Sequence, residues 1–332
     1  MGVSPRLEGL ASVKQDQLRP TRLIEYIGQD QIKDQLGAAL ASAKARDTAL
    51  PHVLLSGPPG LGKTTLAMII ANEMGWTMID LIGSTAGNPT ALTKKIMRIK
   101  PETMFFIDEI HALRKPVQEI LYPVLEDNRV LFRIGSASAE VDLPPVTIMG
   151  ATTDLGKLTQ PFIDRFQLQF ELSFYHVDEL IELGVISSGK LGLNLPEEAI
   201  EVIAERSRGT PRYVNNYLKW VRDFKIFEKV ETVDRKFVQH VMRRKLRIDN
   251  LGLRPLDRNY LRTLADSPTP VGVEAIGSKL RQAVVTLENT VEPFLLYAGL
   301  AVRIRNGRAI TEAGRAHLDS LHRSSSRNPS RA

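Results

Sequence analysis

Eight consecutive residues, Gly57-Pro-Pro-Gly-Leu-Gly-Lys-Thr64, have the types and spacing of a glycine loop that surrounds phosphates. The three glycines let the backbone bend so that its N–H groups face a phosphate chain. Lys63 can neutralise the β- and γ-phosphates, and the Thr64 hydroxyl can reach Mg²⁺. The chemistry indicated is nucleotide binding, with ATP and Mg²⁺ as the expected cofactors. The expected cofactor-binding residues here are Gly57, Pro58, Gly60, Leu61, Gly62, Lys63, Thr64 and Thr65.

The neighbouring residues supply the elements that such a loop needs. An apolar run from His52 to Ser56 predicts a buried strand before it, and the segment from Thr65 to Met74 predicts a helix after it. Strand, glycine loop and helix in this order distinguish a phosphate site from an ordinary glycine turn before a structural helix.

A second apolar strand, Met104 to Glu109, ends in two adjacent carboxylates. At the carboxyl end of a strand both acids can reach a phosphate site. We expect Asp108 to hold Mg²⁺ through water and Glu109 to polarise the water that attacks the γ-phosphate. Elsewhere such a pair is usually a helix cap, but here it follows a phosphate loop.

Three further residues are candidates for the same chemistry. A buried strand, Thr147 to Ala151, is followed by Thr152-Thr153, whose hydroxyls could orient the attacking water. Arg165 lies in a segment where arginine is ordinarily a surface ion-pair partner. Arg212 follows Arg208-Gly-Thr-Pro at a predicted helix start, where its charge opposes the helix dipole, so a γ-phosphate is its expected partner.

The segment upstream of the loop is a candidate for contact with the base. Leu18-Arg19-Pro20 and Tyr26-Ile27-Gly28-Gln29 precede a predicted helix from Ile32 to Ala43. An aromatic and an aliphatic side chain could sandwich an adenine. The expected contacts are Arg19, Tyr26 and Ile27.

Composition indicates a soluble globular protein of two or three domains, with 43% hydrophobic and 25% charged residues among 332. Cysteine is absent, which excludes disulfides and thiolate metal sites, and no apolar run is long enough to span a membrane. We therefore expect a cytoplasmic protein. From Leu253 onward there are 12 Arg or Lys against 7 Asp or Glu, which is compatible with an anionic polymer partner or with a solvated basic face.

The remaining pattern divides the chain into a mixed part and a helical part. Up to about residue 173 we expect a strand at Thr77–Leu81, helices at 88–99 and at Pro116–Asp127, which Pro123 should kink, and a hairpin at Arg129–Leu143. From Phe174 the strands stop. The expected helices are then Val177–Leu183, Pro196–Arg206, Pro211–Lys229 and Thr232–Lys245.

The last quarter has the order of a winged helix. After a linker at Leu251–Pro255 come three predicted helices and a hairpin with Asn306-Gly307 at its turn. Its Arg303, Arg305 and Arg308 could contact DNA phosphates. The alternative is a winged helix that binds another protein. The residues from Arg323 onward are expected to be a disordered basic tail.

These motifs together resemble the RuvB family, bacterial AAA+ motors that drive Holliday-junction branch migration. The resemblance covers roughly residues 17 to 318 and rests on more than the phosphate loop. The other segments that carry it are Leu18-Arg-Pro, Tyr26-Ile-Gly-Gln, His52-Val-Leu-Leu, Phe106-Ile-Asp-Glu-Ile-His111, Glu119-Ile-Leu-Tyr-Pro123, Asp142-Leu-Pro-Pro145, Gly150-Ala-Thr-Thr153, Asp164-Arg-Phe166 and Arg206-Ser-Arg-Gly-Thr-Pro-Arg212.

The resemblance implies an α/β P-loop AAA+ domain (an αβα sandwich) at 1–173, a helical lid at 174–250 and a winged helix at 251–322, with the tail at 323–332. It implies a homohexameric ring around duplex DNA. It also implies that Thr153 is sensor 1, Arg212 is sensor 2 and Arg165 is an arginine finger that reaches a neighbour's ATP.

Three segments depart from the family pattern. The hairpin that contacts RuvA in the family is shorter here by about four residues. The family usually has Pro-Leu-Arg before the finger and glycine after it, where this chain has Phe162-Ile163 and Gln167. The wing has Asn306-Gly-Arg308 for Arg-Gly-Arg. With only Phe132 and Ile134 as bulky side chains near the hairpin turn, we expect a weak contact with a RuvA-like partner, or another partner.

Two other functions fit the same residues. The chain could be an AAA+ loader or remodeller of DNA-bound complexes, in which hydrolysis resets a switch. It could instead be a DNA-binding adaptor whose ATP site only sets assembly. The intact set Lys63, Asp108, Glu109, Thr153, Arg165 and Arg212 argues against an inactive site.

Overall fold

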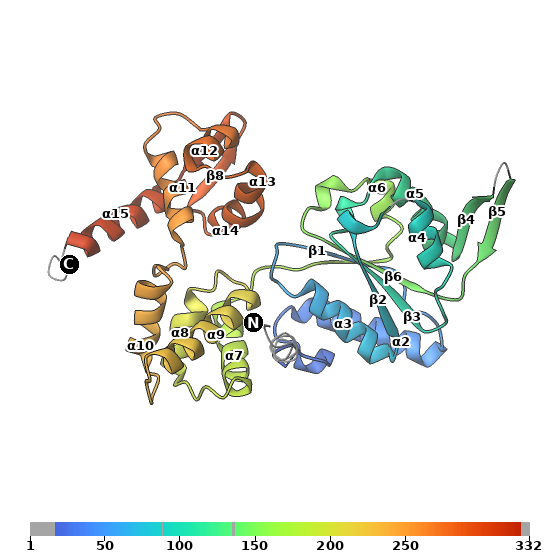
Figure 1. Cartoon of the computed structure of the whole chain (residues 1–332), viewed down its shortest axis with the longest axis horizontal. Helices are drawn as coiled ribbons and strands as arrows, with labels where there is room; N and C mark the ends of the chain where they lie inside the picture. Colours follow the sequence, from blue (N-terminus) through green and yellow to red (C-terminus); the bar gives the residue numbers. More distant parts are fainter. Residues whose placement is uncertain (1–16, 88, 135–136, 327–332) are drawn as a thin grey trace, which may run out of the picture. The chain divides into compact units, whose positions relative to one another are not determined.

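The computed structural model describes residues 17–87, 89–134 and 137–326. The chain forms two compact units (Figure 1). Unit 1 contains Met1–Leu183 and Thr210–Arg212, and unit 2 contains Gly184–Gly209 and Tyr213–Ala332. Within the described part of the chain, no helix combines the length and the apolar character that crossing a bilayer requires.

Unit 1 is built on a five-stranded parallel sheet with the order β2-β3-β6-β1-β7. Its strands are β1 (Val53–Ser56), β2 (Thr77–Ile82), β3 (Thr103–Asp108), β6 (Thr147–Thr152) and β7 (Leu168–Glu171). Every residue of β1 and β6 is buried, which is why these strands are almost continuously apolar in the sequence.

Helices cover both faces of this sheet, with α2 and α3 on one side and α4, α5 and α6 on the other (Figure 1). Apolar side chains of the second layer pack on the sheet and form a core cluster of the unit, with Leu121 and Phe162 fully buried. The αβα sandwich is therefore confirmed. The helical segments are η1 (Leu23–Glu25), α2 (Asp30–Arg46), α3 (Lys63–Met74), η2 (Gly83–Thr85), α4 (Pro89–Ile96), η3 (Ile110–Ala112), α5 (Lys115–Asp127), η4 (Leu155–Lys157) and α6 (Gln160–Ile163).

The expected hairpin is present as β4 (Arg129–Ile134) and β5 (Ala137–Asp142), and Figure 1 shows it extending away from the sheet. The strands pair antiparallel, and Arg129 forms ion pairs with Glu140 and Asp142 on the opposite strand. The turn at residues 135–136 and the side chains of Phe132 and Ile134, on which the partner prediction rests, lie outside the described residues.

The helical part begins with α7 (Val177–Lys190) and continues through α8 (Glu197–Glu205), α9 (Pro211–Phe227) and α10 (Arg235–His240). α10 begins three residues later than predicted because the Asp234 carboxylate caps it, accepting a hydrogen bond from the backbone N of Phe237 at 2.8 Å. A π-helical turn, Val241–Lys245, completes the segment.

Helices α11 to α14, a two-stranded wing and a further helix, α15, form the C-terminal part of unit 2 around a separate core that includes Tyr260, Ile276 and Leu295. The elements are α11 (Pro255–Ala265), α12 (Val273–Leu280), α13 (Val284–Thr286), a π-helical turn (Leu287–Val291), α14 (Glu292–Tyr297), β8 (Ala301–Ile304), β9 (Gly307–Ile310) and α15 (Glu312–Ser326). The winged helix is confirmed.

The helix α15 was not predicted from the sequence. Leu318 on this helix joins the core, so the helix is fixed by tertiary packing. The predicted tail was wrong for residues 323–326, which continue α15, and residues 327–332 lie outside the described residues.

Candidate functional site

The register of the parallel sheet brings most of the predicted catalytic residues to one edge. Ser56, at the end of β1, pairs with Thr152 at the end of β6, and Asp108 ends β3. The glycine loop follows β1 directly. Since the carboxyl ends of parallel strands meet at the same edge of a sheet, the loop, the acidic pair and the two threonines share one site.

Lys63 is buried inside the glycine loop. Its ammonium donates hydrogen bonds to the backbone oxygens of Gly57 at 2.6 Å and Pro58 at 3.0 Å. Burial lowers the pKa of Lys63 to about 8, although the negative charges of Glu109 and Asp108 oppose that change. The amine thus lies within the loop that would hold a phosphate chain, and its hydrogen bonds go to loop carbonyls.

Two tyrosines support the loop from inside the fold. The hydroxyls of Tyr26 and Tyr175 both donate to the backbone oxygen of Leu61 at 3.2 Å, and they are 3.1 Å apart. Burial raises the pKa of Tyr26 to about 12, so its hydroxyl stays protonated and can donate. A Cβ atom on Gly62, whose φ is 104°, would lie 2.6 Å from the Tyr26 hydroxyl, so this position needs glycine.

Tyr26 is 4% exposed, so the structure gives it a role under the loop. Its expected contact with a base stays a prediction, as does that of the half-buried Ile27. Arg19 donates to the Met68 sulfur on α3 at 3.2 Å, which ties this segment to the helix that follows the loop.

Glu109, the second residue of the acidic pair, has an unusual backbone conformation. Its φ of 50° and ψ of 50° lie in the left-handed region, which few residues with a side chain adopt. The backbone N of Glu109 donates to the Asp108 carboxylate at 3.0 Å. The Glu109 carboxylate accepts from the hydroxyl of Thr153 at 3.0 Å. Strain of this kind is typical of functional sites.

His111 is a residue of this site to which the sequence reading gave no role. Its Nδ1 lies 3.2 Å from the Glu109 carboxylate and 2.9 Å from the Thr152 hydroxyl. The hydrogen bond of Nδ1 is with the Thr152 hydroxyl, and its contact with Glu109 is an ion pair when the imidazole is protonated. Thr153 and His111 thus hold the same oxygen of Glu109. The feature of the sequence that could have identified this residue is a histidine two positions after the acidic pair.

Arg212 also lies at the loop. It occupies the first turn of α9, as predicted, and its backbone N donates to the Gly60 oxygen at 3.4 Å. A Cβ atom on Gly60 would lie 3.2 Å from the Arg212 Cβ. The positive charge of Arg212 is one of the causes that lower the pKa of Lys63, so the two cations belong to one electrostatic environment.

Arg165 lies near the amino ends of the parallel strands, opposite the carboxyl ends that carry the loop. It precedes the start of β7, and the four residues of that strand rise roughly 13 Å toward the edge that carries the loop. Its guanidinium pairs with Glu126 at 2.6 Å, donates to the Pro161 oxygen and lies 4.3 Å from the centre of the Tyr122 ring. Arg165 is therefore separated from the loop of its own chain.

The residues at the loop fit Mg²⁺ that is held with a nucleotide. The described residues contain no cluster of three or more His, Asp or Glu side chains arranged to hold a metal alone. Thr64 and Thr65 are in the first turn of α3, and Asp108 ends the neighbouring strand β3. One hydroxyl and one carboxylate suit Mg²⁺, which keeps waters and takes further ligands from phosphates.

The wing arginines have unequal environments. Glu292 is 1% exposed and accepts from Tyr260 at 2.7 Å, from Arg303 at 2.7 Å and from Arg308 at 3.0 Å. Two of the three predicted DNA contacts thus have a protein partner. Arg305, at the wing turn, is exposed.

Comparisons with known proteins cover nearly the whole chain. The family model described as the Holliday junction DNA helicase RuvB P-loop domain matches residues 18–172. The RuvB AAA lid domain matches residues 175–249, and the RuvB C-terminal winged helix domain matches residues 250–319.

Individual relatives agree with these matches. The Holliday junction branch migration complex subunit RuvB of Synechococcus sp. (strain CC9311) is 41% identical over 316 residues, which are 93% of this chain and 88% of that protein. The subunit of the same name from Granulibacter bethesdensis is 42% identical over 323 residues, or 95% of this chain and 89% of that protein. The solved structure of the Thermotoga maritima RuvB Holliday junction branch migration motor has a TM-score of 0.84 at 39% identity, covering 91% of this chain and 98% of that chain.

The depressed pKa of Lys63 makes nucleotide binding sensitive to pH. Near pH 8 about half of the amine of the free protein is neutral, and a bound phosphate chain should restore its proton. We expect ATP binding there to take up a fraction of a proton, which calorimetry in buffers of different ionisation enthalpy measures. In Lys63→Arg, whose guanidinium is always charged, the uptake should vanish. Equal binding enthalpies for the unaltered protein in all buffers would contradict this expectation.

Proposed function

The chain belongs to the RuvB family, and from that premise we propose that it is an ATP-driven DNA motor that moves Holliday junctions by branch migration. The observation that carries this proposal is one sheet edge on which a glycine loop with a buried Lys63 and a strained Glu109 lie together. A winged helix follows in the same chain. This combination supports hydrolysis coupled to DNA better than nucleotide binding alone.

The residues of this edge divide the work of phosphoryl transfer. Lys63 and the loop N–H groups would bind the phosphates of ATP, and Thr64 with Asp108 would hold Mg²⁺, which neutralises charge on the phosphates. Glu109 would accept a proton from the attacking water, oriented for this by the hydrogen bond from Thr153 and the contact with His111. Arg212 would contact the γ-phosphate from the first turn of α9.

The proposal is tested by ATP turnover with and without duplex DNA, together with dissociation of a four-way junction. Glu109→Gln should bind ATP and lose turnover by at least about 100-fold, because an amide cannot accept the proton. The exposed Glu119→Gln serves as the matched control.

Each alternative function predicts its own result. Turnover stimulated by DNA without junction dissociation would identify a loader or remodeller. DNA binding with no turnover in the unaltered protein would identify an adaptor, and either result would overturn the proposed motor.

We propose that Arg165 acts on the ATP of a neighbouring copy in a homohexameric ring, because its place at the far sheet edge keeps it from the ATP of its own chain. Arg165→Ala should lose about 10³–10⁵ in turnover rate and still bind ATP. Mixed with Lys63→Ala, it should regain turnover, because Lys63→Ala subunits supply the missing arginine. A double variant, Lys63→Ala with Arg165→Ala, should give no recovery. Recovery with that double variant, or none with Lys63→Ala in rings of proven exchange, would contradict the role.

We propose that Arg305 is the wing arginine that contacts DNA phosphate. Arg305→Ala should flatten the salt dependence of duplex binding by about one unit of log K per log salt, without sequence preference. Arg308→Ala should instead lower the melting temperature, because the buried Glu292 loses a charged partner. The two variants are compared by binding titrations in a salt series and by thermal unfolding. An unchanged slope in Arg305→Ala would assign the DNA contact to other residues.

A further inference from the structure

We propose that Arg208 is a positioning residue that fixes the winged helix to the lid, so that the nucleotide state sensed at Arg212 sets the position of the DNA-binding domain. This inference deepens the proposed function and rests on it. It concerns the two parts of unit 2, the helices α8 to α10 and the winged helix, together with the short segment from Arg208 to Arg212.

Arg208 is a lid residue whose charged group lies among winged-helix residues. Its side chain is 2% exposed, and its Nε donates to the Gly252 oxygen at 2.7 Å. Its Nη2 pairs with the Asp257 carboxylate, which is fully buried. The guanidinium also lies 5.3 Å from the centre of the Phe294 ring on α14. These contacts replace water around the charge, so the guanidinium has little freedom to change partners.

Asp257 has hydrogen-bond partners besides Arg208. It lies in the first turn of α11, where its carboxylate accepts from the backbone N of Arg254 at 2.7 Å and from the Arg254 Nε at 3.2 Å. The same carboxylate therefore caps α11 and binds Arg208. Removing one partner of a buried ion pair leaves an uncompensated charge, which is strongly destabilising. The pair thus resists separation.

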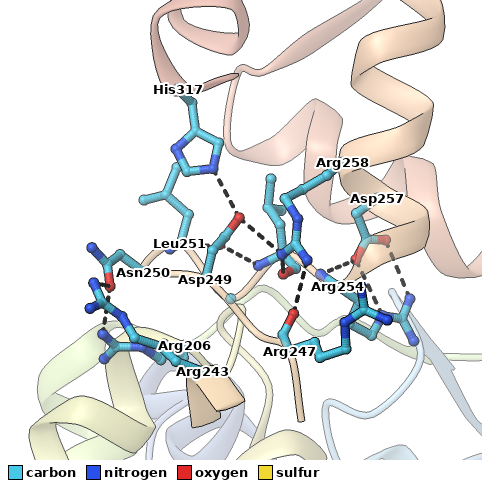
Figure 2. A network of polar contacts seen from close by, with 12 residues as sticks. Arg206, Arg243, Arg247, Asp249, Asn250, Leu251, Arg254, Asp257, Arg258 and His317 are labelled. Atoms are coloured by element: carbon cyan, nitrogen blue, oxygen red, sulfur yellow. Dashed lines mark hydrogen bonds and ion pairs between the residues drawn. The ribbon is translucent and has the colours of Figure 1, made fainter. Parts of the chain in front are cut away.

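A second set of contacts fixes the chain between the lid and the winged helix. Figure 2 shows the Asp249 carboxylate between His317 of α15 and Arg258 of α11, at 3.1 and 3.3 Å. The other Asp249 oxygen accepts from the backbone N of Leu251 at 3.0 Å and of Leu253 at 2.8 Å. Although burial alone would raise the pKa of Asp249, the hydrogen bonds from His317 and Leu253 lower it overall, so the group stays ionised.

The lid side of this connection is equally ordered. Arg206 and Arg243 both donate to the side-chain oxygen of Asn250, at 2.8 and 2.9 Å (Figure 2). Gly252 has a φ of 78°, and a Cβ atom there would collide with the backbone oxygen of Arg206. The segment that the sequence predicts to be a linker is therefore packed against the lid. Lid and winged helix have the contacts of one rigid body.

Arg208 also lies close in sequence to the candidate nucleotide sensor. Gly209, Thr210 and Pro211 alone separate it from Arg212, and Thr210–Arg212 pack with unit 1. Arg212 contacts Gly60 of the glycine loop through its backbone. A displacement of Arg212 when the γ-phosphate leaves would be transmitted within this short segment to Arg208, and through Asp257 to α11. A flexible joint would absorb that displacement.

The rigid joint is tested directly by distance measurement. Because the chain has no cysteine, spin labels can be placed at two exposed positions, Asn216→Cys on α9 and Ser278→Cys on α12. We expect one narrow distance distribution that is the same with ADP and with a non-hydrolysable ATP analogue. A distribution that shifts with the nucleotide, or a broad one, would overturn the proposal without any reference to DNA activity.

Coupling is tested with a variant that removes both buried charges, Arg208→Met with Asp257→Asn, so that neither is left unpaired. The amide introduced by Asp257→Asn would keep an oxygen to cap α11. We expect DNA-free ATP turnover to persist and its stimulation by duplex DNA to fall at least about fivefold, the low end of coupling between sites. Arg222→Met on α9, which removes an arginine paired with Asp223, should keep the stimulation.

Failure of this inference and failure of the proposed function give different results. If the unaltered protein shows DNA-stimulated turnover and the folded double variant retains it, the joint has no coupling role and the motor stands. If the unaltered protein shows neither stimulation nor junction dissociation, the motor is wrong, and the spin-label distances still decide whether the joint is rigid.

Discussion

The parallel register of the central sheet is the constraint on which the candidate active site depends. Because β1, β3 and β6 run in the same direction, the loop after Ser56, the acid Asp108 and the hydroxyl of Thr152 meet at one edge. Each local feature is ordinary elsewhere: a glycine turn, a helix cap or a strand-end threonine. Their chemistry arises because the register brings them together, with the Lys63 amine buried in the loop.

The same edge shows how the fold prepares groups before any ligand binds. The left-handed backbone of Glu109, the hydrogen bond from Thr153 and the contact with His111 hold the carboxylate in one orientation. Tyr26 and Tyr175 support the loop from below, and burial keeps their hydroxyls protonated. Groups fixed in advance need little reorganisation during reaction, which is where much enzymatic rate enhancement originates.

In unit 2, buried carboxylates organise the structure. Asp257 caps the start of α11 and binds the lid through Arg208. Glu292 accepts hydrogen bonds from Tyr260 and from two wing arginines. A buried charge is stable only with charged and hydrogen-bonding partners, so each of these acids determines which arginines surround it. Their distribution explains why a basic C-terminal region leaves Arg305 exposed while its neighbours are paired.

The sequence alone determined the features whose cause is local. The loop pattern, the buried strands, the Gly209–Pro211 helix break before Arg212 and the Asn306-Gly307 wing turn were all predicted, because backbone preference and periodicity act over a few residues. The tertiary structure alone decided the partners of the charges. Arg208 meets Asp257 across 49 residues and Arg308 meets Glu292 across 16, and the imidazole of His111 reaches Thr152 across 41. No periodicity specifies such pairs, since they depend on which buried acid or hydroxyl the packing of distant elements brings within hydrogen-bond distance.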